Sequence, residues 1–112
     1  MRKITSEVCE AFENGRKFRK GNDEVVVFPE EGRIEMRLHG NTIARKYTDN
    51  PGEIQISDAG WSTNTTKERL NGLHGVRISQ KDFVWYLNGE IWEGEKDGYR
   101  YFHPFTKITL NN

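Results

Sequence analysis

Apolar residues in the first part of the chain recur at helical spacing, and those that follow alternate as in strands. The helical set consists of Ile4, Val8, Ala11 and Phe12. This spacing predicts a short amphipathic helix with one buried face. We expect Thr5 to cap its N-terminus, because a threonine hydroxyl can accept a hydrogen bond from a free amide of the first turn. Gly15, which tolerates a left-handed backbone, is expected to end the helix, and a basic loop is expected over 16–20.

Alternation of apolar and polar residues then predicts a first group of antiparallel strands. The expected strands cover 24–28, 33–38, 42–47 and 54–56. They are separated by two segments with the composition of tight turns, His39-Gly40-Asn41 and Asp49-Asn50-Pro51-Gly52. Pro29 is expected to end the first strand, because it cannot donate a backbone hydrogen bond.

A second, smaller helix is predicted at about 65–71. Thr65 and Glu68 have the spacing of a capping box, in which each side chain satisfies a free amide of the other residue. Gly72 is expected to end the helix. Because so short a helix is unstable alone, packing must hold it in place. We expect Trp61 to be its anchor.

A second group of strands is predicted after this helix. Phe83, Trp85 and Leu87 share one face of an expected strand, so Trp85 is assigned to the core. Tyr86 points to the opposite face, where we expect it to be substantially exposed. Two hairpin turns and a final strand complete the group: Asn88-Gly89, Asp97-Gly98 and 107–110.

These elements predict a single α+β domain over residues 1–112. It has a short N-terminal helix, antiparallel hairpins or a meander, and one small helix between two groups of strands. Apolar residues make up 34% of the chain and the mean hydropathy is −0.86, so the core must be thin and rich in aromatic residues. No run of about 18 apolar residues exists, which excludes a membrane-spanning helix. The first residues lack the apolar stretch of a secretory signal, so we expect a cytosolic protein.

The sequence gives little support for a metal, a cofactor or a catalytic centre. Cys9 is the only cysteine and cannot by itself form a disulfide or a structural zinc site. His39, His74 and His103 lack the close pairing that zinc sites use, and the first two lie beside glycines in expected surface turns. No serine has the context of a nucleophile elbow, and no glycine-rich phosphate loop is present. We therefore expect no catalytic residues, metal ligands or cofactor, and a protein that is not an enzyme.

Two segments resemble a motif of small proteins from tailed bacteriophages. The first, within 58–73, reads Gly-Trp-Ser-x-x-Thr-Thr-Lys-x-Arg-Leu-Asn, and the second, within 84–94, is a Trp-Tyr-Leu-Asn-Gly hairpin. The resemblance spans most of residues 7–94. It implies a phage origin and expression in the bacterial host cytoplasm, and it supplies no catalytic residues. Residues 95–112 are interpreted as a C-terminal extension.

A local basic patch is predicted around the second helix. The 17 basic and 17 acidic residues give a formal net charge of zero, which argues against a dedicated polyanion binder but allows such a patch. Hydroxyl and amide side chains crowd the start of the helix, where free amides and the helix dipole favour a phosphate. The candidate residues are Thr63, Asn64, Thr66, Lys67, Arg69, Arg77 and Lys81. In the alternative interpretation, the threonines only cap the helix and the cations are solvated.

Aromatic residues gather near the C-terminus and suggest a second binding surface. Eight of the 13 are Phe83, Trp85, Tyr86, Trp92, Tyr99, Tyr101, Phe102 and Phe105. One face of this segment is needed for the core, and the other is a candidate stacking platform or protein-binding patch, with Tyr86 as its anchor.

These features lead to three functional expectations. The first is a binding module that acts on nucleic acid or on a nucleic-acid-handling host complex, a defence system included. The second is a protein-only inhibitor or adaptor that masks a host enzyme through the aromatic surface. The third is a small-ligand sequestering protein or a small enzyme. Salt dependence separates the first two, because phosphate contacts weaken steeply with salt.

Overall fold

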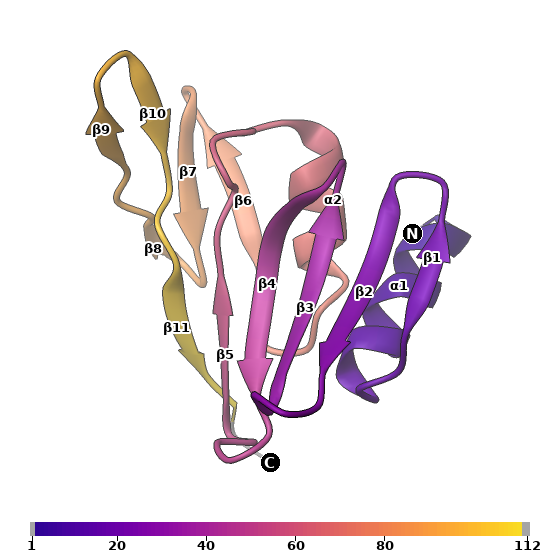
Figure 1. Cartoon of the computed structure of the whole chain (residues 1–112). Coiled ribbons are helices and arrows are strands. Elements are labelled where there is room, and N and C mark those ends of the chain that lie inside the picture. The colour runs from indigo at the N-terminus through magenta and orange to yellow at the C-terminus, as the bar shows by residue number, and fades with distance from the viewer. Residues whose placement is uncertain (1, 111–112) are drawn as a thin grey trace.

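A six-stranded antiparallel sheet forms the body of the protein in the computed structural model, which describes residues 2–110 (Figure 1). Its strands lie in the order β1 (Phe18–Lys20), β2 (Asp23–Phe28), β3 (Arg33–Leu38), β4 (Asn41–Tyr47), β5 (Glu53–Ile56) and β11 (Thr106–Thr109). β11 comes from the C-terminal end of the chain and pairs with β5. The last strand thus completes a sheet that the first half of the chain builds. The predicted final strand and the predicted hairpin at His39-Gly40 are both confirmed.

Helix α1 (Lys3–Glu13) packs against β1, β2 and β3. It ends at Asn14 and Gly15, whose φ of 65° is left-handed, as predicted. Its predicted cap is wrong: Arg2 is the N-cap, and Thr5 lies inside the helix with no exposed surface. The Thr5 hydroxyl instead donates to Glu68 at 2.7 Å, because α1 and the second helix pack against each other. The predicted basic loop also contains the edge strand β1.

Helix α2 (Asn64–Asn71) follows β5 and starts one residue earlier than predicted. Thr63, not Thr65, is its N-cap, and the Thr63 hydroxyl accepts a hydrogen bond from the Thr66 amide at 3.1 Å. The predicted capping box is therefore wrong, since Glu68 is used in contacts with α1. Trp61 is no buried anchor, because 59% of its surface is exposed. Leu70 fixes the helix to the core instead.

Two small sheets stand at the end of the molecule away from α1 (Figure 1). One contains β6 (Ile78–Lys81), β7 (Val84–Leu87) and β8 (Glu90–Ile91), and the other contains β9 (Glu95–Asp97) and β10 (Arg100–Phe102). The predicted turn at Asn88-Gly89 is confirmed, with positive φ at both residues. The α+β class, the N-terminal helix and the small helix between two groups of strands are likewise as predicted.

Phe83 does not continue β7 toward the core. It forms the turn between β6 and β7 together with Asp82, and both residues have positive φ, 52° for Asp82 and 68° for Phe83. Its side chain is 95% exposed, whereas Trp85 is 5% exposed and lies in the core as predicted. The alternation of apolar and polar residues, which predicted that Phe83 shares a strand face with Trp85, runs into this turn. The turn contains no glycine that would have indicated it in the sequence. Neither described helix is long and apolar enough to cross a membrane.

Candidate partner-binding surface

The hairpins after α2 build a surface of aromatic and apolar side chains. Its floor is buried and consists of Trp85, Trp92 and His103, and its exposed rim consists of Phe83, Val84, Ile91 and Tyr101. We call these seven residues the aromatic surface. Together with Ser62, Gln80 and Glu93 they line a cavity of about 290 Å³.

The floor is a close group of rings from β7 and from the segments that follow β8 and β10. The His103 ring stacks on Trp85 with 5.7 Å between centroids and lies 4.6 Å from Trp92. Tyr101 meets the same imidazole edge-on at 5.5 Å. The Trp92 indole N–H donates to Thr106 at 2.8 Å, which ties this floor to β11 of the large sheet. A floor held from several directions in this way is rigid, because each ring is fixed by packing.

A buried carboxylate positions the His103 ring. Asp58 has no exposed surface, and its Oδ2 lies 2.6 Å from Nδ1 of His103. The same carboxylate accepts hydrogen bonds from the Ser62 hydroxyl at 2.5 Å and from the His103 and Gly60 amides, both at 2.9 Å. Burial alone would raise the pKa of Asp58, but these hydrogen bonds outweigh burial and lower it to about 2.

The ionised Asp58 fixes which nitrogen of His103 carries the proton. A carboxylate can only accept, so Nδ1 donates to it, and in the neutral ring Nε2 is left as an acceptor. Every fully buried side-chain nitrogen or oxygen within 2–110 has a hydrogen-bond partner. Because no described group bonds to Nε2, that atom is not fully buried, and His103 is one of the residues that line the cavity. No local sequence pattern predicts this pair, since 45 residues separate its members.

Tyr101 occupies its place because Gly94 has no side chain. A Cβ added at Gly94 would come within 2.2 Å of the Tyr101 ring and hydroxyl. The Tyr101 ring lies against the backbone at Gly94 and lines the cavity. Any larger residue at Gly94 would displace Tyr101, whose exposed side chain can move away at little cost.

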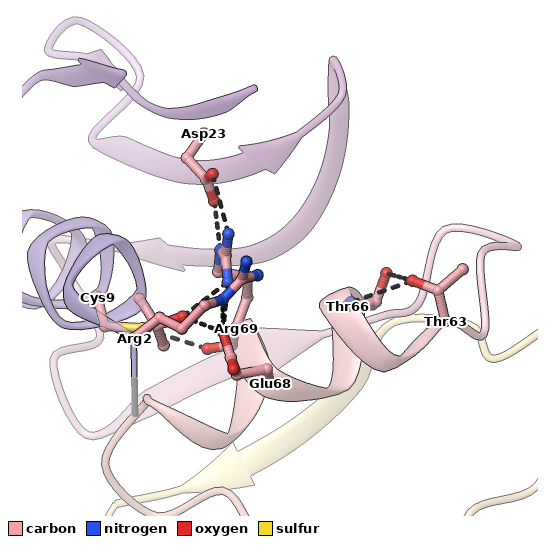
Figure 2. A network of polar contacts seen from close by, with 8 residues as sticks. Arg2, Cys9, Asp23, Thr63, Thr66, Glu68 and Arg69 are labelled. Atoms are coloured by element: carbon pink, nitrogen blue, oxygen red, sulfur yellow. Dashed lines mark hydrogen bonds and ion pairs between the residues drawn. The ribbon is translucent and has the colours of Figure 1, made fainter. Parts of the chain in front are cut away.

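Most of the predicted nucleic-acid contacts at the start of α2 are used inside the fold. The Thr63 hydroxyl caps the helix and lies 3.1 Å from the Thr66 hydroxyl, and Thr66 is 1% exposed (Figure 2). Asn64 is exposed. The alternative interpretation, that the threonines serve the helix, is the one that the structure supports at Thr63 and Thr66.

The expectation that Arg69 lies on a solvated face is wrong. Arg69 is 4% exposed and points toward Asp23 of β2, with Nε at 2.7 Å from Oδ1 (Figure 2). Its Nη1 donates to Thr5 and Glu68, both at 2.7 Å. This guanidinium joins α1, α2 and the large sheet, and it is not available to a ligand.

The remaining predicted cations are at the surface but do not form one cluster. Lys67 donates to Gln80 at 3.2 Å, which places it near Lys81 on β6. Arg77 lies before the other end of β6, roughly 13 Å away along the strand. Tyr86 is on the opposite face of β7 from Trp85 and is half-buried, so its predicted substantial exposure is corrected.

The hollow beside the start of α2 is mostly apolar. It has a volume of about 460 Å³, and Trp61, Leu38 and Ile43 are among its walls. Among the described residues that line it there is no lysine or arginine, whereas Asp58 is included. The described lining of this hollow therefore offers no lysine or arginine side chain that could bind a phosphate.

Comparison with known proteins places the chain in a phage family. Residues 1–108 match the model of the Kyanoviridae Gp96 protein family, and the chain belongs to that family. This match confirms that the chain is a phage protein, as its resemblance to proteins of tailed bacteriophages implied. The match runs through residue 108 and so includes most of the segment interpreted as an extension. No curated protein and no solved structure was found to match.

Proposed function

We propose that this member of the Kyanoviridae Gp96 protein family is a non-enzymatic binding module that docks a host protein on its aromatic surface, in the host cytoplasm. This is the inhibitor or adaptor function that the aromatic segment suggested. The proposal places the partner on the rim residues Phe83, Ile91 and Tyr101, above the buried floor.

The conformation and exposure of Phe83 carry this proposal. A bulky residue with positive φ is strained, and asparagine or glycine would suit this turn better. The side chain gains nothing from the fold in return, because 95% of its surface is exposed. A strained and exposed aromatic residue beside a rigid ring floor has the features of a binding anchor.

The charges around the aromatic surface favour a protein over a nucleic acid. Between residues 80 and 102 the exposed carboxylates are Asp82, Glu90, Glu93, Glu95 and Asp97, and the cations are Lys81, Lys96 and Arg100. The net charge of this segment is −2, which repels phosphates. The nucleic-acid prediction stays open for Lys67, Arg77 and Lys81, and it is the alternative outcome of the experiment below.

The environments of Ser62 and Cys9 support binding rather than hydrolysis. Ser62 donates its hydroxyl proton to Asp58 and not to His103, so the histidine does not activate it. Burial, with a smaller contribution from Glu13, raises the pKa of the Cys9 thiol to about 12, which leaves it protonated and unreactive.

Affinity capture from infected host lysate, with and without nuclease, tests the proposal. The baits are the wild-type chain, Phe83→Asn and Gly94→Ala. Asparagine tolerates the positive φ at residue 83, and alanine at residue 94 displaces Tyr101 without removing it. We expect a single host protein that the wild type retains after nuclease treatment and that both variants lose.

Gly52→Ala is the matched control for Gly94→Ala. A Cβ at Gly52 meets no atom within 4 Å, and Gly52 lies in the turn between β4 and β5, outside the aromatic surface. This bait should retain the partner as the wild type does. Loss of the retained material on nuclease treatment would replace the proposal with nucleic-acid binding, and equal retention by all baits would exclude the aromatic surface as the docking site.

A further inference from the structure

We infer that the cavity in the aromatic surface binds a guanidinium group, so that the protein partner places an arginine side chain against the cavity wall formed by Trp85, Trp92 and Tyr101. The inference rests on the proposed function, because it specifies the chemistry of the partner at the same surface. It extends that proposal from a patch that binds protein to a pocket with a defined occupant.

The rings that line the cavity suit a flat cation. Trp85 and Trp92 lie 6.3 Å apart between centroids at an angle of 33°, and Tyr101 is edge-on to His103, which contacts both indoles. Aromatic faces attract cations, tryptophan most strongly. A guanidinium also stacks on such rings, because it is planar and weakly hydrated.

The polar atoms in the cavity can accept hydrogen bonds from such a group. In its neutral form His103 presents Nε2 as an acceptor, Glu93 contributes a carboxylate, and Gln80 contributes an amide oxygen. A guanidinium has five N–H donors and no acceptor, so it can satisfy all three. A phosphate or a carboxylate would instead face the charge of Glu93 and the lone pair of Nε2.

Lys67 shows that a cation is accommodated at the edge of this cavity. Its ammonium group lies 5.9 Å from the Trp85 ring centroid and donates to Gln80. The described residues that line the cavity itself include no lysine or arginine, so Glu93 has no cation beside it there. A positive charge that pairs with Glu93 in the cavity would therefore come from the partner.

The size of the cavity agrees with one side chain as the occupant. Its volume of about 290 Å³ is just below the range of roughly 300–1,000 Å³ for pockets that hold whole small molecules. The exposed rim around it then contacts the rest of the partner.

The test uses N-acetyl-arginine amide as the probe and N-acetyl-citrulline amide as the matched neutral analogue. Both are titrated into the full chain while the indole N–H resonances of Trp85 and Trp92 are followed by NMR. We expect the arginine probe to bind with a Kd on the order of 1 mM and to shift these signals, and the citrulline probe to bind roughly tenfold more weakly. Equal binding of the two probes, or shifts confined to other residues, would overturn the inference.

Paired carboxylate variants locate the binding site. Glu93→Gln removes the carboxylate from the cavity, whereas Glu95→Gln removes a neighbouring carboxylate that does not line it. We expect Glu93→Gln to weaken arginine binding roughly tenfold and Glu95→Gln to leave it unchanged. An equal effect of both substitutions would mean that the probe responds only to the general negative charge.

Asp58 is a positioning residue in this scheme. In Asp58→Asn the side-chain oxygen can still accept from the two backbone amides, and the NH₂ group then faces Nδ1 of His103. The ring proton moves to Nε2, which becomes a donor and repels the guanidinium. The change of tautomer is read from the imidazole ¹⁵N shifts, and arginine binding should fall with it. A changed tautomer with undiminished binding would contradict the role of Nε2.

The outcomes separate this inference from the proposed function. If the partner is captured as proposed but the arginine probe neither binds nor competes with it, the inference fails and the protein-binding surface stands. If the arginine probe binds in the cavity but capture does not depend on Phe83 or Gly94, the proposed function fails and the cavity stands as a guanidinium site.

Discussion

The buried carboxylate of Asp58 makes stability depend on pH in a window that can be calculated. Its pKa falls from a reference value of 3.8 to about 2 on folding. Because the folded value is the lower one, the stabilisation is complete above the reference pKa and is lost as pH falls through 3.8 toward 2. A difference of nearly two pKa units corresponds to about 2 kcal/mol of unfolding free energy. Solvent does not screen the hydrogen bonds that Asp58 accepts, since Asp58 has no exposed surface.

Urea denaturation of the wild type and of Asp58→Asn, from about pH 5 to about pH 2, isolates this contribution. Other acidic groups with lowered pKa values, Glu35 and Glu68, are present in both proteins and cancel in the comparison. The wild type should be the more stable protein at the upper limit, and its advantage should shrink by about 2 kcal/mol at the lower one. An advantage that does not change with pH would refute the assignment of Asp58 as an ionised acceptor.

Three further predictions concern the structural residues. Thr63→Ala should lower stability by about 1 kcal/mol and Thr65→Ala by much less, measured by thermal unfolding, because only the first caps α2; equal effects would put the cap elsewhere. Arg69→Ala should cost about 3–5 kcal/mol in urea unfolding, since it leaves Asp23 buried without its partner, and a loss below about 1 kcal/mol would contradict this role. The Cys9 thiol should resist a disulfide reagent at mildly alkaline pH until the chain is unfolded, because burial raises its pKa to about 12; rapid labelling of the folded protein would show that it is accessible.

Local sequence signals predicted most of the fold. The turn pairs His39-Gly40 and Asn88-Gly89 have the positive φ values that this composition favours, and the strands on either side follow from them. The signal failed at Phe83, because alternation continued into a turn made by Asp82 and Phe83. Aspartate tolerates a positive φ, but phenylalanine is not a usual residue for it.

Errors at the two helices have a tertiary cause. Thr5 and Thr65 both have the chemistry of a cap, and Glu68 has the spacing that a capping box needs. In the folded chain Glu68 lies against α1 and bonds to Thr5, a contact between residues 63 positions apart. The same packing buries Arg69, and no local pattern distinguishes it from the half-buried Lys67.

The candidate site was only partly visible in the sequence. Aromatic density pointed to the correct segment, and Trp85 was assigned to the core correctly. Asp58 and His103 were missed, because the chain brings them together from distant positions. The exposed anchor was placed at Tyr86, whereas the rim of the cavity is formed by Phe83 and Tyr101.

The most direct test of the protein-binding surface compares two variants in one capture experiment. Phe83→Asn alters the rim of the aromatic surface, and the combined variant Lys67→Ala, Arg77→Ala and Lys81→Ala removes the predicted basic residues. We predict that Phe83→Asn loses the host partner while its thermal midpoint stays equal to or above that of the wild type, because the turn is relieved of strain. The combined variant should retain the partner at both low and physiological salt. Loss of the partner by the combined variant, with full retention by Phe83→Asn, would contradict the account and establish the basic residues as the contact.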